Sequence, residues 1–348
     1  MLRHALHDLM KLNRGPLPWP RAVRYMIAIG APLAAGLIVG QSASGVIAAL
    51  NAMLSSQNDL GGTLKQRVAG MAGVSLAIVV GGTIGAFTDI KYWPFVVLFI
   101  CGYFVGRMHG TSLVIENIAR FFAFGVVLAA TLKLSSPTLI PLSLAGGVWA
   151  IAVVCVDYWA RKSAPTRVGG SMREGFQRFR MGEAASWRFA IFYAATITVA
   201  LLLAEEFGAQ RAGWVAITTI VVMRPDGHES IQLVLQRMAG TLFGVSVAGS
   251  MFVFVDNQWA LFVALCVLAC LLPLCMSWHR WLGVAAVTAT AMVMVHLTLF
   301  ASGGARSLLS VRIYDTLLGC VLAVFGTLVA SADVTRNPPP STDSVETP

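Results

Sequence analysis

The chain has 348 residues, of which 57% are hydrophobic and only 12% are charged. A soluble domain carries about 25% charged residues, so this composition excludes a soluble globular protein and predicts an integral membrane protein. The net charge of +9 does not indicate nucleic-acid binding, because the basic residues separate apolar segments and form no continuous tract with aromatic residues.

The first 21 residues precede the first long apolar run. Residues 1–21 carry charges throughout and have no continuous apolar core, so they do not predict a cleavable signal peptide. Leu2, Leu6 and Leu9 share part of a helical face. We therefore expect a cytoplasmic or interfacial segment that lies on the membrane surface.

Apolar runs separated by charged residues, proline and glycine predict twelve membrane-spanning helices in the rest of the chain. The expected fold class is all-α and polytopic. The predicted spans are 22–40, 43–56, 67–88, 93–107, 113–132, 138–159, 187–206, 212–223, 237–256, 259–277, 281–300 and 308–330.

The basic residues favour one orientation of these spans. If the N-terminus is cytoplasmic, all but five of the 25 Lys and Arg residues lie on the cytoplasmic side. The five exceptions are Lys91, Lys133, Arg211, Arg306 and Arg312. This asymmetry predicts that both termini lie in the cytoplasm.

A short motif occurs twice, as QRVAG at 66–70 and as QRMAG at 236–240. Each copy follows the second predicted span of a six-span half, and His109 and His279 each precede the fifth span of their half. Matching signals in two halves with an even number of spans predict two six-helix repeats that run parallel through the membrane.

The repeats divide the chain into segments. The first six-helix repeat covers 22–160, and the second covers 187–332. Between them, the basic linker 161–186 is expected to form a short amphipathic helix on anionic lipid headgroups. The polar, proline-rich tail at 333–348 is expected to be disordered.

No motif in the chain indicates an enzyme or a cofactor. The nucleophile motif GxSxG, the Walker A motif and histidine-rich metal motifs are absent, which also argues against an ATP-driven pump. The six cysteines lie in or beside apolar runs without CxxC spacing and are expected to pack as small hydrophobic residues. Asp226 and Glu229 are interpreted as helix-capping residues and not as metal ligands.

Arg67 and Arg237 of the repeated motif, together with Arg224, are the candidate substrate-binding residues. We expect Arg67 and Arg237 at the N-terminal ends of their spans, where free backbone N–H groups favour anions. A guanidinium group adds bidentate recognition of a carboxylate. The alternative is that these arginines are ordinary positive-inside residues in contact with lipid phosphate.

The spans that precede the two motif arginines are unusually short. Segments 43–56 and 212–223 give about 20 Å of helix, against a bilayer core of about 30 Å. Short segments at matching positions of two halves are typical of a transporter substrate site. This observation favours the substrate-binding role of Arg67 and Arg237.

Asp315, Arg312, Glu116 and His296 are the candidate proton-coupling residues. Asp315 is expected about two turns into a span, with Arg312 on the same helical face, and a structural ion pair is the alternative. Glu116 precedes Arg120 by four residues, which favours an ion pair on one helical face. The alternative is that both side chains snorkel toward the membrane surface. His296 lies deep in a span, where a local hydrogen bond is the commoner explanation.

The second half carries a recognisable pattern from 186 to 332. The residues are Arg224, Pro225, Arg237, Gly240, Thr241, Gly244, Arg312, Asp315, Thr316 and Gly319. This pattern resembles the fusaric acid resistance family of bacterial inner-membrane proteins, which includes exporters of aromatic carboxylic acids. Plant aluminium-activated malate channels are similar at a greater distance. The first half matches more loosely, with SSQND at 55–59 in place of RPDGHE.

The resemblance implies a multi-pass protein of the bacterial inner membrane that exports small organic anions, in particular aromatic carboxylic acids. We expect exchange with protons to drive export. An oligomeric organic-anion channel and a non-transport membrane scaffold are the alternatives. We expect membrane lipids to surround the protein. A periplasmic adaptor subunit and further copies of the chain, in a homo-oligomer, are possible partners. No metal or other cofactor is expected.

Overall fold

The computed structural model of the chain describes residues 17–86, 92–132, 136–161, 169–207, 212–299 and 305–336. These residues form thirteen helices and no strand, so the all-α prediction is confirmed for this part of the chain. Most of the expected interfacial segment, residues 1–16, and most of the expected tail, residues 337–348, lie outside the described residues.

The helices in chain order are α2 (Trp19–Ile38), α3 (Ser42–Gln57), α4 (Leu64–Gly85), α5 (Trp93–Met108), α6 (Leu113–Leu132), α7 (Ser136–Arg161), α8 (Met172–Arg180), α9 (Trp187–Glu206), α10 (Gly213–Val222), α11 (Gly227–Phe254), α12 (Gln258–Trp278), α13 (Arg280–Leu299) and α14 (Ala305–Arg336). Each of the twelve predicted spans falls on one of these helices, and α8 lies in the predicted linker.

The protein is a multi-pass membrane protein. Within the described ranges, nine helices are long and apolar enough to cross a membrane. The other three predicted spans are shorter: α3 and α5 have 16 residues each, and α10 has only 10. Since a bilayer core needs about 20 helical residues, these three helices do not cross it by their own length.

The start of α11 differs from the prediction. The Asp226 side chain accepts a hydrogen bond from the backbone N–H of His228, so the predicted cap is confirmed and the helix begins at Gly227. Arg237 therefore lies in the third turn of α11, and its expected place beside free backbone N–H groups is wrong. Polar residues after the cap continue the helix, whereas hydropathy alone placed its start at the first apolar run.

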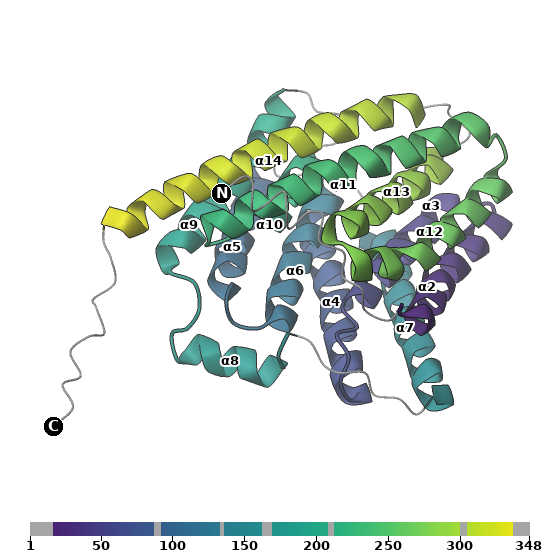
Figure 1. Cartoon of the computed structure of the whole chain (residues 1–348), viewed down its shortest axis with the longest axis horizontal. Helices are drawn as coiled ribbons and strands as arrows, with labels where there is room; N and C mark the ends of the chain where they lie inside the picture. The colour runs from purple at the N-terminus through teal and green to yellow at the C-terminus, as the bar shows by residue number, and fades with distance from the viewer. Residues whose placement is uncertain are drawn as a thin grey trace.

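The two halves of the chain make corresponding helix contacts. α4 packs against α6 as α11 packs against α13, and α3 packs against α7 as α10 packs against α14. Between the halves, α5 packs against α9 as α12 packs against α2 (Figure 1). Each half thus presents its first and fourth helices to the other half.

Glycines allow the helices to approach closely at these contacts. A Cβ atom on Gly81 would overlap the carbonyl oxygen of Phe122, where α4 crosses α6. In the second half, a Cβ atom on Gly244 would lie 2.5 Å from the carbonyl oxygen of Ala285, where α11 crosses α13. Small residues at helix crossings are the usual basis of packing in membranes, where no hydrophobic effect drives helices together.

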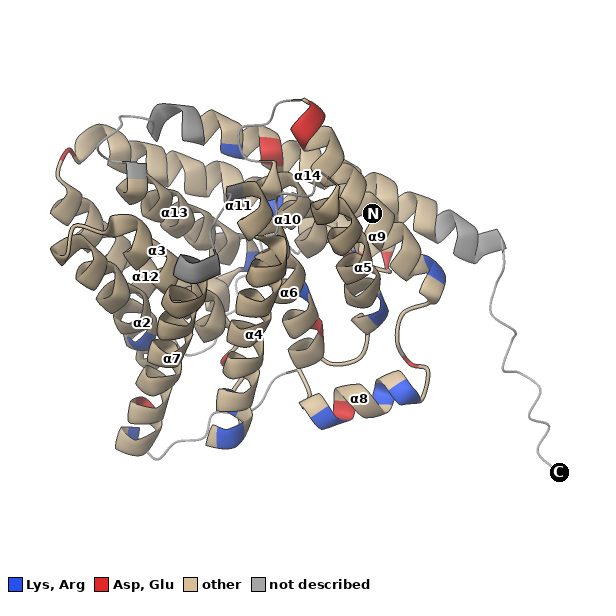
Figure 2. Ribbon diagram, turned by 180° about the vertical axis from the view of Figure 1, so that it is seen from behind, with Lys and Arg blue, Asp and Glu red and all other residues tan. Residues whose placement is uncertain are grey.

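One end of the bundle carries many of the charged residues. α8 lies across this end, and charged residues mark α8 itself and the nearby ends of α4 and α7 (Figures 1 and 2). We call it the α8 end, and it includes the loops 58–63, 109–112 and 223–226. The predicted linker helix is thus present as α8, while its contact with lipid headgroups stays a prediction.

Candidate functional site

A cavity of 280 Å³ lies between helices of both halves. It is lined by α3, α4, α6 and α7 of the first half and by α10 and α13 of the second half. Because the C-terminal end of α3 lies at the α8 end, the N-terminal turns of α3 that line the cavity face the opposite end. Its volume is at the small end of ligand pockets, which begin at about 300 Å³.

The wall of this cavity is mainly apolar. Its polar side chains are Asn51, Thr131, Ser143, Trp214 and Thr298. The Asn51 amide donates a hydrogen bond of 2.8 Å to the carbonyl oxygen of Ser143, which joins α3 to α7. A small apolar cavity with a few polar groups is suited to a small organic molecule.

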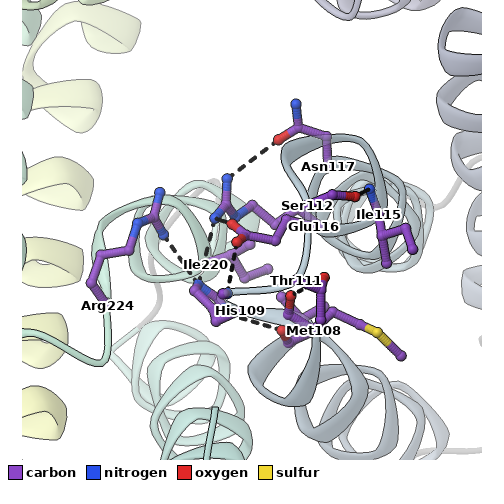
Figure 3. Close-up of polar contacts among 12 residues, drawn as sticks. Met108, His109, Thr111, Ser112, Ile115, Glu116, Asn117, Ile220 and Arg224 are labelled. Atoms are coloured by element: carbon purple, nitrogen blue, oxygen red, sulfur yellow. Dashed lines mark hydrogen bonds and ion pairs between the residues drawn. The ribbon is translucent and has the colours of Figure 1, made fainter. Parts of the chain in front are cut away.

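A second feature lies at the α8 end, around His109. This side chain is 2% exposed and follows the last residue of α5. Its Nδ1 lies 2.9 Å from the carbonyl oxygen of Val105, so Nδ1 carries the proton and Nε2 is the acceptor. The guanidinium groups of Arg120 and Arg224 lie 3.5 Å and 3.4 Å from that Nε2. Figure 3 shows Arg224 reaching toward His109. One neutral imidazole nitrogen thus faces two cationic side chains from opposite halves of the chain.

Aromatic side chains of α9 fix the position of this cluster. The His109 ring lies 5.6 Å from the ring of Phe189 and 5.3 Å from the ring of Tyr193, between centroids. The Tyr193 hydroxyl donates a 2.7 Å hydrogen bond to the carbonyl oxygen of Ile220 near the end of α10. α9 therefore positions both the imidazole and the loop that carries Arg224.

Two carboxylates lie near the two arginines. Glu116 accepts a hydrogen bond of 2.7 Å from Arg120 and another of 2.9 Å from the backbone N–H of Gly110. The predicted pair of Glu116 and Arg120 is therefore confirmed. Glu229 lies 3.5 Å from Nε of Arg224, but its side chain is 49% exposed, so water screens that pair.

The electrostatics of the cluster keep the imidazole neutral. Burial, and then the charges of Arg120 and Arg224, hold the pKa of His109 well below its ordinary value. Burial, and then the charge of Arg120, lower the pKa of Arg224 to about 10, so its guanidinium stays charged at neutral pH. The cluster is therefore a partly buried site with two adjacent positive charges, which an anion would stabilise.

Arg67 lies at the same end, but in an ion pair. It is 1% exposed, and its Nε and Nη2 donate to the two carboxylate oxygens of Asp59 at 2.7 Å each. Arg24 lies 3.4 Å from the same carboxylate. Substrate binding by Arg67 would require this pair to open, and it stays a prediction. The sequence signal for this pair is an acidic residue eight positions before the motif arginine.

Asp59→Asn is expected to lower the free energy of unfolding by about 3–5 kcal/mol, because it leaves Arg67 buried without a counter-charge. Burial alone would raise the pKa of Asp59, but the hydrogen bonds and charge of Arg67 and the charge of Arg24 hold it below the ordinary value of an aspartate. The contribution of the pair is therefore fully present above that ordinary pKa and is lost as the pH falls through the lowered pKa of the folded protein.

Thermal unfolding in detergent at pH 7 measures this effect. Glu183→Gln is the matched control, because Glu183 forms a pair of 3.8 Å in which both side chains are more than half exposed. An Asp59→Asn protein as stable as the control variant would contradict the assigned role of the pair.

The second half contains a separate group of buried charges. Arg312 lies on α14, and its guanidinium carbon is 3.9 Å from the ring centroid of Trp214 on α10. Arg237 on α11 and Asp315 on α14 are also buried. Asp315 interacts electrostatically with Arg312. The structural ion pair considered as the alternative for these two residues stays a prediction.

Comparison with known proteins finds a similarity in this half. Residues 198–326 match the family described as fusaric acid resistance protein-like. Over 143 residues the chain is 28% identical to the uncharacterized membrane protein YvaC of Bacillus subtilis (strain 168). This matched segment covers 40% of the chain and 22% of YvaC. The chain thus spans about a fifth of that relative, and no solved structure matches.

The fusaric acid resistance protein-like segment contains most of the predicted site residues. Those inside it are Arg224, Arg237, His296, Arg312 and Asp315, and those outside it are Arg67 and Glu116. The structure brings Arg224 and Glu116 into one cluster and places Arg237 and Arg312 in another. Arg67 lies apart with Asp59, and none of these side chains lines the 280 Å³ cavity.

His296 takes a different position from the other predicted proton-coupling residues. It lies on α13, is 8% exposed, and its ring stacks on Phe252 of α11 with 4.1 Å between centroids.

Sequence reasoning missed the site roles of His109, Arg120 and Trp214. The one available signal was that His109 and His279 hold matching places in the two halves.

Proposed function

We propose that this membrane protein exports small organic anions, in particular aromatic carboxylates, across the bacterial inner membrane in exchange for protons. The observation that carries the proposal is the convergence of Arg120 and Arg224 on one nitrogen of His109, at 3.5 Å and 3.4 Å. The match to the fusaric acid resistance protein-like family supports a transporter-like role.

A carboxylate is the ligand that suits this cluster. Charge-assisted hydrogen bonds to guanidinium groups are about 2.7–2.9 Å long and are stronger than the long contacts with a neutral imidazole. A carboxylate between Arg120 and Arg224 would also reduce the repulsion between the two cations. We assign the cluster as the site that collects the anion at the α8 end. In this proposal the α8 end and both termini face the cytoplasm.

We further propose that the two halves are six-helix repeats. Their matching helix contacts support this assignment, and so do the starts of α2 and α9. Both helices have 20 residues and begin with a tryptophan, Trp19 and Trp187, and both have a buried tyrosine at the seventh position, Tyr25 and Tyr193. Rocking of one repeat against the other would expose the cavity between them to alternate sides.

Proton exchange is assigned to the buried side chains of the second half, with Asp315 as the carrier of the proton and Arg312 as the charge that responds to it. His296 and Glu116 are the secondary candidates, and Glu116 would have to release Arg120 to take up a proton. An oligomeric anion channel would use the same arginines without coupling to protons, and a scaffold would use none of them.

Growth of a deletion strain tests the proposal. Cells without the protein are expected to be more sensitive to hydroxybenzoates, fusaric acid and related weak acids, because intracellular carboxylate accumulates when export is lost. Expression of the wild-type chain should restore growth. Unchanged sensitivity across the whole panel would contradict the exporter assignment.

A further inference from the structure

The two motif arginines have different surroundings, although their positions correspond. In the first half, both carboxylate oxygens of Asp59 accept hydrogen bonds from Arg67 at 2.7 Å. Asp59 precedes Arg67 by eight residues, and the residue eight before Arg237 is Glu229. Glu229 is 49% exposed and lies 3.5 Å from Arg224. Within the described ranges, no carboxylate forms an ion pair with Arg237 as Asp59 does with Arg67.

Arg237 is buried without a replacement for that carboxylate. It is 9% exposed in the third turn of α11, and its Nε has no hydrogen-bond partner among the described residues. One turn later on the same face, the hydroxyl of Thr241 is also buried without a partner in the described part of the chain. A buried guanidinium N–H that lacks an acceptor destabilises the fold unless a ligand supplies one.

A second guanidinium group lies close to the first. Arg312 on α14 is 4% exposed, its Nη1 has no partner within the described ranges, and it interacts electrostatically with Arg237. The other titratable groups that interact with this pair are Asp315 and Cys320, both on α14. Two buried cations with unused donors that lie near one another indicate a site for an anion.

Trp214 connects this site to the cavity. Its ring lines the 280 Å³ cavity and also lies 3.9 Å from the guanidinium carbon of Arg312. An aromatic acid in the cavity could place its ring beside Trp214 and its carboxylate toward Arg312. The cavity wall is otherwise mostly apolar, which suits the ring and not the carboxylate.

We propose that Arg237 and Arg312 bind the carboxylate of a small aromatic acid inside the second half. The ligand carboxylate would take the place at Arg237 that Asp59 takes at Arg67. The identity of the ligand as transported substrate rests on the proposed function, whereas the existence of the anion site rests on the unpartnered donors. The two halves would thus have separate roles, with a permanent internal counter-ion in one and an exchangeable ligand in the other.

Thermal unfolding of the full chain in phosphate-free detergent tests this inference. The matched variants are Arg237→Met and Arg67→Met, which remove the same charge from corresponding positions. Without an added anion, Arg237→Met should unfold at the wild-type temperature or higher, because it removes an unpaired buried charge. Arg67→Met should unfold several degrees lower, because it leaves Asp59 without its partner. Equal losses in both variants would overturn the proposal.

Addition of benzoate gives the second measurement. Benzoate should raise the Tm of the wild-type protein and of the control variant Arg173→Gln, because Arg173 is an exposed residue of α8. The apparent Kd for benzoate should increase about tenfold or more in Arg237→Met and in Arg312→Gln. A benzoate affinity unchanged in both variants would overturn the site. If the affinity falls as expected but no flux of carboxylates is found, the anion site stands and the transport function fails.

Discussion

Arg224→Gln is expected to reduce the export rate of 4-hydroxybenzoate at low substrate concentration by about tenfold to a hundredfold. The amide keeps a hydrogen-bond donor but removes one of the two positive charges at the His109 cluster, and a hydrogen bond to a charged group contributes about 1.5–3 kcal/mol. Arg120→Gln should have a similar effect, because Arg120 lies at the same imidazole nitrogen. Flux into inside-out proteoliposomes measures both.

Two variants make this prediction specific. Arg224→Lys keeps the charge but loses the planar fork of donors, so it should retain part of the flux. Arg178→Gln removes an exposed arginine of α8, whose side chain is 54% exposed, and should leave the flux unchanged. If Arg224→Gln transports as fast as Arg178→Gln, the cluster does not collect the anion.

Asp315→Asn is expected to abolish the accumulation of substrate against its gradient while exchange of labelled for unlabelled substrate continues. An asparagine cannot carry a proton, so transport loses its driving force but not its anion site. Proteoliposomes with an imposed pH gradient measure accumulation, and the same vesicles without a gradient measure exchange.

Asp256→Asn is the control for this second variant, because Asp256 is an exposed carboxylate between α11 and α12. It should accumulate substrate like the wild-type protein. Full accumulation by Asp315→Asn would remove Asp315 from the coupling mechanism. A wild-type protein that only equilibrates substrate would instead favour the channel.

Helix positions were predictable from sequence because apolar runs of this length have no other stable structure in a membrane. Each predicted span coincides with a helix, from α2 to α14. The start of α11 was not predictable in the same way, since five of the first ten residues after Asp226 have polar side chains and hydropathy does not register this segment as part of a span. The Asp226 cap was the signal that located the true start.

The side-chain clusters were less predictable, because they join residues that are distant in sequence. His109 and Arg224 are 115 residues apart, and the packing of α9 against both α5 and α10 brings them together. Glu116 and Arg120 were predictable because residues four apart on a helix always lie side by side. Arg67 and Asp59 were close in sequence, but the loop between α3 and α4 that folds Asp59 back has no clear signature.

Reconstituted wild-type protein tests the central claim most directly. In inside-out proteoliposomes with an acidic lumen, 4-hydroxybenzoate should accumulate above its external concentration, and a protonophore should reduce the accumulation to equilibrium. Absence of flux for every carboxylate in the panel, or accumulation that does not respond to the pH gradient, would contradict proton-driven export of organic anions.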